Sequence, residues 1–200
     1  AFQGELTSLD AFEGPSLCTP KEVIIHESAI GLLLPLQGGL TLRKLMSLRK
    51  NGERSFKLSE LTQLLQGIHA ALSPLHKEGL AHGGIKAENV FMSAQEGGDE
   101  QQLITLSDAR LSASIGLEVF VKAQRATGVG HAIAPELARG ALTPASDVYS
   151  LGALLFEALS KQSMQGGRRP LTNLLNSPSL APLDALLDRA LSEDPSARYS

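Results

Sequence analysis

The chain has 200 residues, 42% of them apolar, a length and composition that suit one domain with a single sizeable core. A formal net charge of −3 gives no electrostatic reason to expect nucleic acid as a partner, and with six Phe, two Tyr and no Trp we expect no base-stacking surface. The single Cys18 excludes an intrachain disulfide or a thiolate metal cluster, so we expect a reducing, cytoplasmic location.

The first half of the chain predicts a short hairpin and then helices. Residues 1–22 carry glycines and prolines without clear periodicity. The apolar runs at 23–26 and 31–34 predict a β-hairpin. The longest apolar run, 29–36, is far shorter than the roughly 20 residues that cross a bilayer, so we expect no membrane segment in this chain.

After the break at residues 37–39, a helical spacing of apolar residues resumes over 41–48. The basic residues of this region are interpreted as a solvated helix face, with a docking site as the alternative. They are Arg43, Lys44, Arg49, Lys50, Arg54 and Lys57.

The clearest helix prediction covers residues 58–76. Apolar residues recur there at three- and four-residue steps, which is typical of a buried helix stripe. We expect Ser59 to cap the start and Gly79 to end the helix. Pro74 predicts a late kink, because a proline inside a helix removes one hydrogen bond. The stripe consists of Leu58, Leu61, Leu64, Leu65, Ile68, Leu72 and Leu75.

The second half predicts a strand pair and two more helices. Segments 89–92 and 103–106 indicate paired strands around a polar loop. Residues 111–140 show no strong periodicity, and we interpret them as a mobile segment. A helix follows with Thr143 as cap and Pro144 in its first turn. Its stripe is Val148, Leu151, Leu154, Leu155 and Leu159. Residues 160–179 are predicted to be rich in loops, and a last helix starts near Pro182.

The string HGGIKAEN at residues 82–89, the HGG loop, resembles the catalytic loop of eukaryotic-type protein kinases, H-R-D-L-K-P-E-N. That loop carries the family's catalytic carboxylate, a phosphate-facing lysine and a metal-binding asparagine. Lys86 and Asn89 match the last two. Gly84 stands at the catalytic Asp position and Gly83 at the arginine position. The resemblance therefore implies a kinase fold that has lost its catalytic base.

Other family motifs follow in the expected order. LPLQGG at 34–39 is similar to the family's hinge, and SDAR at 107–110 is similar to its D-F-G region. APE at 134–136 matches the end of the activation segment, and DVYSLG at 147–152 matches the start of the central helix. DPSAR at 194–198 matches the motif D-P-x-x-R. Each is weak alone, but together they indicate an α+β kinase-like fold. The resemblance covers roughly residues 36–199.

The resemblance also implies which residues would bind nucleotide and metal. Lys86 would face the transferred phosphate, Asn89 and Asp108 would hold magnesium, and Leu36 would lie in the hinge against ATP. A carboxylate and an amide oxygen suit a hard cation that keeps several waters. The alternative for these residues is structural: a turn asparagine, a loop-capping aspartate and a solvated lysine.

A second set of residues has implied structural roles. Glu136 and Arg198 would form a buried ion pair that ties the activation segment to the large lobe. Asp147 would accept hydrogen bonds from the backbone of the HGG loop. His82 would pack beneath the D-F-G ring, but Ala109 supplies no ring at that position.

The region before the hinge is short for this family. It contains no G-x-G-x-x-G, and Lys21 is its only lysine. We therefore divide the chain into residues 1–37, a remnant or fragment of the small β lobe ending in the hinge, and residues 38–200, the helical C-terminal lobe.

These features lead to one hypothesis and two alternatives. The first is a pseudokinase that requires no cofactor and acts by binding another protein, as a scaffold or allosteric regulator in signalling. The second is a divergent serine/threonine kinase that uses Mg-ATP, with Glu88 or Asp108 as a substitute base. The third is a domain in which nucleotide is only a structural ligand.

Overall fold

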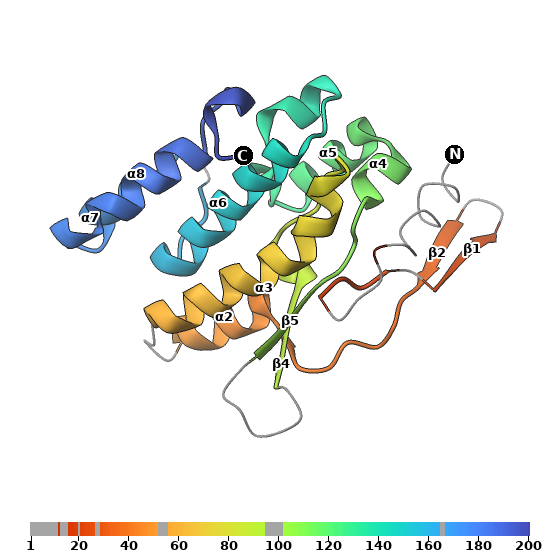
Figure 1. The fold of residues 1–200 in the computed structure, drawn as a ribbon, viewed down its shortest axis with the longest axis horizontal. Helices are drawn as coiled ribbons and strands as arrows, with labels where there is room; N and C mark the ends of the chain where they lie inside the picture. Colours follow the sequence, from red (N-terminus) through yellow and green to blue (C-terminus); the bar gives the residue numbers. More distant parts are fainter. Residues whose placement is uncertain are drawn as a thin grey trace.

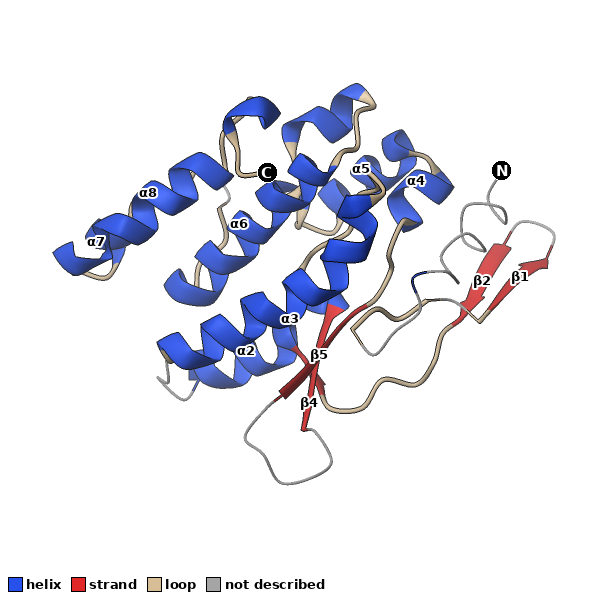
Figure 2. Ribbon diagram, viewed as in Figure 1, coloured by secondary structure: helices blue, strands red, loops and turns tan. Residues whose placement is uncertain are grey.

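The computed structural model describes residues 12, 16–19, 21–26, 29–51, 56–94, 102–164 and 167–200. In chain order the strands and α-helices are β1 (Glu22–His26), β2 (Ala29–Leu33), β3 (Leu40–Thr41), α2 (Leu42–Asn51), α3 (Leu58–Lys77), β4 (Val90–Ala94), β5 (Gln102–Leu106), α4 (Leu111–Ile115), α5 (Leu117–Ala126), α6 (Pro144–Ser160), α7 (Leu171–Leu174) and α8 (Ala181–Ala190). Helices form most of the described fold, and the strands lie in two separate places, β1 and β2 at the right of the view and β4 and β5 below α3 (Figures 1 and 2).

The strands form two small antiparallel sheets. The predicted hairpin is confirmed as β1 paired with β2. The predicted strand pair is confirmed as β4 and β5, with Val90 opposite Leu106, and β3 adds to the free side of β4. The N-terminal segment joins the other side of β5. There the Cys18 N–H donates to the Leu106 carbonyl at 2.7 Å, and the Leu106 N–H donates to the Ser16 carbonyl at 2.9 Å.

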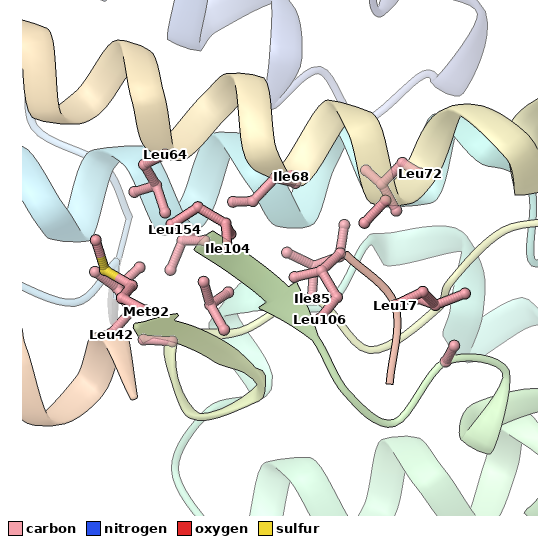
Figure 3. Close-up of a cluster of buried hydrophobic side chains, with 14 of the residues drawn as sticks. Leu17, Leu42, Leu64, Ile68, Leu72, Ile85, Met92, Ile104, Leu106 and Leu154 are labelled. Carbon is pink, nitrogen blue, oxygen red and sulfur yellow. The ribbon is translucent and has the colours of Figure 1, made fainter. Parts of the chain in front are cut away.

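The long helix α3 forms the main core with the second sheet. Its residues Leu64, Ile68 and Leu72 face Ile104 and Leu106 of β5 (Figure 3). Burial of such side chains stabilises the fold by about 1.5–3 kcal/mol each. Gly67 permits the close approach, because a Cβ at this position would lie 2.4 Å from the Ile104 Cβ.

The ends of α3 differ in part from the prediction. Ser59 is not the cap: the helix begins at Leu58, and Lys57 is the N-cap residue. The Glu60 carboxylate accepts a hydrogen bond from the Lys57 N–H at 2.7 Å, which explains the earlier start. The helix continues through Pro74 to Lys77. Gly79 follows the end of the helix, as predicted, with φ +71°.

The second helical core lies between α6, α7 and α8. Leu155 and Phe156 of α6 pack with Leu171 and Leu187. Thr143 is the N-cap of α6 and Pro144 its first residue, as predicted. The last helix begins at Ala181, within one residue of the predicted start. None of the described helices is both long and apolar enough to cross a membrane.

The prediction of a mobile segment over residues 111–140 is wrong. The segment contains α4, α5 and two short 3₁₀ helices. Phe120 and Val121 of α5 are buried against Ala134 and Leu137, which form a third, small core. The sequence signal was weak because these helices are too short to show several repeats of an apolar stripe.

Candidate functional site

The HGG loop is fixed to the first turn of α6 through Asp147. The Asp147 carboxylate accepts hydrogen bonds from the His82 N–H at 2.7 Å and the Gly83 N–H at 2.8 Å. His76 Nε2, near the end of α3, lies 2.8 Å from the same carboxylate. Asp147 is buried, so these contacts hold a charge away from water. The family resemblance implied the two backbone contacts of Asp147, but nothing in the sequence predicted its contact with His76.

His82 is fully buried, and burial lowers the pKa of its imidazole, so the ring is neutral. Its Nδ1 accepts a hydrogen bond from the Gly84 N–H at 3.2 Å, which places the ring proton on Nε2. Nε2 makes no hydrogen bond of good geometry within the described residues, although the Ser107 backbone interacts with the ring. Ala109 is buried as well, but its methyl group supplies no ring surface above the imidazole.

The residues that the resemblance assigns to metal binding lie close to Gly84. A Cβ built at Gly84 would be 3.7 Å from Asn89 Nδ2 and 3.5 Å from the Asp108 carbonyl oxygen. Asn89 Nδ2 donates to the Gly84 carbonyl at 2.9 Å, which leaves the amide oxygen available. The Asp108 carboxylate makes no hydrogen bond or ion pair with the described part of the chain. These two oxygen donors fit the ligand preference of magnesium.

The other polar residues of the HGG loop point to helices. Lys86 Nζ donates to Gln124 Oε1 of α5 at 3.1 Å. Glu88 Oε1 accepts from Arg43 Nε of α2 at 2.8 Å, and Glu88 Oε2 is buried without a partner among the described residues. One Glu88 oxygen is thus paired with Arg43 and the other is shielded from solvent, which makes this residue a poor substitute base.

Arg43 is not part of a solvated helix face. Its guanidinium also donates to both oxygens of Glu157 on α6, at 2.5 and 3.1 Å. The hydrogen bonds to Glu157 and Glu88 raise the pKa of the guanidinium, although burial opposes this. Arg49 is paired as well, with Glu60, whereas Lys44 and Lys57 are exposed. Arg54 and the side chain of Lys50 lie outside the described residues.

The hinge segment follows β2 as a loop. The side chain of Leu36 is 99% exposed, so it packs against none of the other predicted site residues. The Pro35 carbonyl accepts a hydrogen bond from the Gln37 side chain at 3.2 Å. Residues 34–39 are therefore positioned by the ends of β2 and β3 and not by contacts of Leu36.

Glu136 and Arg198 form a buried, bidentate ion pair, with N–O distances of 2.6 and 2.9 Å. Ser146 donates to the same carboxylate at 2.8 Å, and Arg198 also donates to the Ala145 carbonyl. Burial raises the pKa of Glu136, but the hydrogen bonds from Arg198 and Ser146 outweigh it and hold the pKa below its ordinary value. The pair joins the segment after α5 to the end of the chain.

Comparison with known proteins decides the family. Residues 1–200 match the protein kinase domain. The chain belongs to the protein kinase family. The match includes the first 35 residues, which the motifs alone had left outside the resemblance.

Bacterial serine/threonine kinases are among its relatives. The chain is 34% identical to pkn2 of Myxococcus xanthus over 128 residues, 64% of this chain and 15% of that protein. It is 29% identical to PkaA of Streptomyces coelicolor over 210 residues, 100% of this chain and 37% of that protein. The chain thus spans well under two thirds of these curated relatives.

The fold is similar to that of solved kinase domains. The crystal structure of the Mycobacterium tuberculosis PknI kinase domain superposes with a TM-score of 0.75 at 20% identity, covering 100% of this chain and 73% of that one. This likeness shows a protein kinase fold, mostly helical with small antiparallel sheets. Protein kinases use Mg-ATP.

The two adjacent glycines of the HGG loop should respond differently to substitution. Gly83 has φ +74°, and a Cβ there would lie 2.3 Å from Ser112 Oγ, whereas a Cβ at Gly84 meets only ordinary contacts. We expect Gly83→Ala to lower the free energy of unfolding by about 2–4 kcal/mol. Gly84→Ala, the matched control, should change it by less than about 1 kcal/mol. Chemical denaturation measures both, and equal losses would contradict the loop geometry.

Removal of the Glu136 charge should strongly destabilise the protein. Glu136→Gln leaves Arg198 buried without its counter-ion, which costs roughly 3–5 kcal/mol at neutral pH. The pKa of Glu136 is lower in the folded state than in the unfolded chain. The ionised carboxylate therefore stabilises the fold fully at pH values above the ordinary glutamate pKa, and this stabilisation is lost as the pH falls through the folded-state pKa. The difference between wild type and variant should therefore shrink in acid. Glu118→Gln, at an exposed helix pair, serves as the control and should cost under about 0.5 kcal/mol.

Proposed function

We propose that this domain is a pseudokinase that acts by binding another protein, as a scaffold or allosteric regulator in signalling. The observation that carries the proposal is the chemistry around Gly84. A kinase needs a carboxylate there to accept the proton of the attacking hydroxyl, and such a base contributes about 10²–10⁴-fold to the rate. Glycine has no group that can accept a proton.

The nearby carboxylates support this proposal, because most of them are already engaged. Asp147 holds the loop backbone and His76. Glu88 is paired with Arg43. Lys86, the residue at the phosphate-facing position, is hydrogen-bonded to Gln124 of α5. Catalysis at this site would require new positions for several groups that already have partners.

Two surfaces are the candidates for a protein partner. The first is the side of the hinge, where residues 24–40 carry the exposed apolar side chains Ile24, Leu33, Leu36 and Leu40. The strand register places Ile24 and Leu33 on the same face of the β1–β2 hairpin. The second is the segment 111–140, whose helices cover the HGG loop. Exposed apolar side chains of this kind mark interaction sites when they gather on one surface.

Phosphotransfer should be absent in the wild type. With Mg-ATP and generic protein substrates, we expect no incorporation of labelled phosphate above background, because no base stands at position 84. The Gly84→Asp variant tests whether this absence is the decisive defect, since the space at Gly84 accepts a Cβ without contacts closer than 3.5 Å. Robust transfer by the wild type, equal to that of Gly84→Asp, would end the proposal.

The divergent serine/threonine kinase is the second candidate, and two observations favour it. The Asp108 carboxylate has no partner among the described residues, and the Asp108 backbone and the Asn89 side chain both lie close to Gly84. The relatives with sequence similarity are named as serine/threonine kinases. In this reading Asn89 and Asp108 would hold magnesium, which would bring the phosphates of ATP to Lys86. Asp108 would then also be the remaining candidate for a base.

A thermal-shift measurement separates nucleotide binding from its absence. The pseudokinase proposal requires no nucleotide, whereas the kinase candidate predicts a higher melting temperature with magnesium and ATP together. Asp108→Asn should remove such a shift, because it deletes the charge while asparagine tolerates the positive φ of this residue. A shift without turnover would indicate nucleotide as a structural ligand. A shift that survives in Asp108→Asn would show that the negative charge of Asp108 is not needed for binding.

A further inference from the structure

A cavity of about 240 Å³ lies between α2 and the C-terminal end of α6, away from Gly84. Residues from three parts of the chain line it: Arg43, Met46, Ser47 and Arg49 of α2, Phe56 before α3, and Glu157, Ala158 and Lys161 at the end of α6. Its volume is slightly below the roughly 300–1,000 Å³ of sites for drug-sized ligands, so it suits a small molecule.

The walls of the cavity combine an apolar surface with a few polar groups. Met46, Phe56 and Ala158 supply the apolar part. The Arg49 guanidinium stacks over the Phe56 ring, 4.2 Å from its centroid, which fixes the ring in place. Ser47 contributes a hydroxyl group. Such a lining favours a flat apolar body with one polar end.

The charges of the lining residues indicate the sign of that polar end. Both Glu157 oxygens are occupied by Arg43, and Arg49 is held by Glu60 through two hydrogen bonds of 2.6 and 2.8 Å. Lys161 is the exception, because its ammonium group has no ion pair or hydrogen bond in the described part of the chain. An anionic ligand would therefore find Lys161 available, whereas a cationic ligand would find both Glu157 oxygens already occupied.

We propose that this cavity binds a small amphipathic monocarboxylate, with its apolar body against Phe56, Met46 and Ala158 and its carboxylate on Lys161. A single charge fits better than a phosphate, because the C-terminal end of α6 contributes partial negative charge near Lys161. The site is separate from the nucleotide and metal residues of the HGG loop, none of which lines it. Binding there does not depend on whether the domain transfers phosphate.

Phenylacetate and its neutral isostere phenylacetamide test the proposal by NMR titration of the labelled protein. We expect saturable shifts of amide signals in α2 and at residues 157–161, with a dissociation constant on the order of millimolar or tighter. Phenylacetamide should bind about tenfold more weakly, because it cannot make the charged contact. Absence of saturable binding up to concentrations on the order of 10 mM, or equal binding of the two compounds, would overturn the proposal.

Variants at the cavity assign the contact. Lys161 has φ +58°, so Lys161→Asn removes the charge with a residue that tolerates this backbone, and its melting temperature should not fall. It should weaken phenylacetate binding about tenfold or more, while Lys161→Arg retains it. Lys44→Asn, an equal charge change at an exposed position of α2 that does not line the cavity, is the matched control and should bind normally. Ser47→Leu should block the cavity. Unchanged affinity in Lys161→Asn or in Ser47→Leu would overturn the assignment.

Discussion

The buried carboxylate of Asp147 holds together the parts of the molecule on which the candidate site depends. It accepts hydrogen bonds from two successive backbone amides of the HGG loop, and His76 of α3 reaches the same group. One side chain at the start of α6 thus links the central helix, the long helix and the loop between them. A buried donor left without its acceptor costs about 1–3 kcal/mol, so the loop conformation follows from this anchor.

The structural framework of the family is present, and position 84 carries a glycine where the family's catalytic loop has a carboxylate. The anchor at Asp147, the neutral His82 and the Glu136–Arg198 pair depend on burial and hydrogen bonding, and they stabilise the fold whether or not phosphate is transferred. The carboxylate missing at Gly84 contributes nothing to packing. The fold therefore does not depend on which residue stands at position 84.

Sequence reasoning succeeded where a signal repeats along the chain. The strand pair β4–β5, the Thr143–Pro144 start and most of the stripes of α3 and α6 were predicted from periodicity and capping chemistry, although Leu58 at the start of α3 is exposed. It failed where few residues carry the signal. The helix α5 buries mainly Phe120 and Val121, and the start of α3 was decided by one side chain, Glu60. Motif resemblance located the HGG loop, but not the contacts of Arg43 with Glu88 and Glu157, which are 45 and 114 residues away in the sequence.

The left-handed backbone at Gly83 bears on how this domain could change over evolutionary time. A carboxylate could arise at position 84 through a single substitution, because a side chain there meets only ordinary contacts. A side chain at position 83 could not arise as simply, since its first carbon would lie 2.3 Å from the Ser112 hydroxyl and the backbone there is left-handed. Two neighbouring glycines therefore differ in how freely selection could replace them.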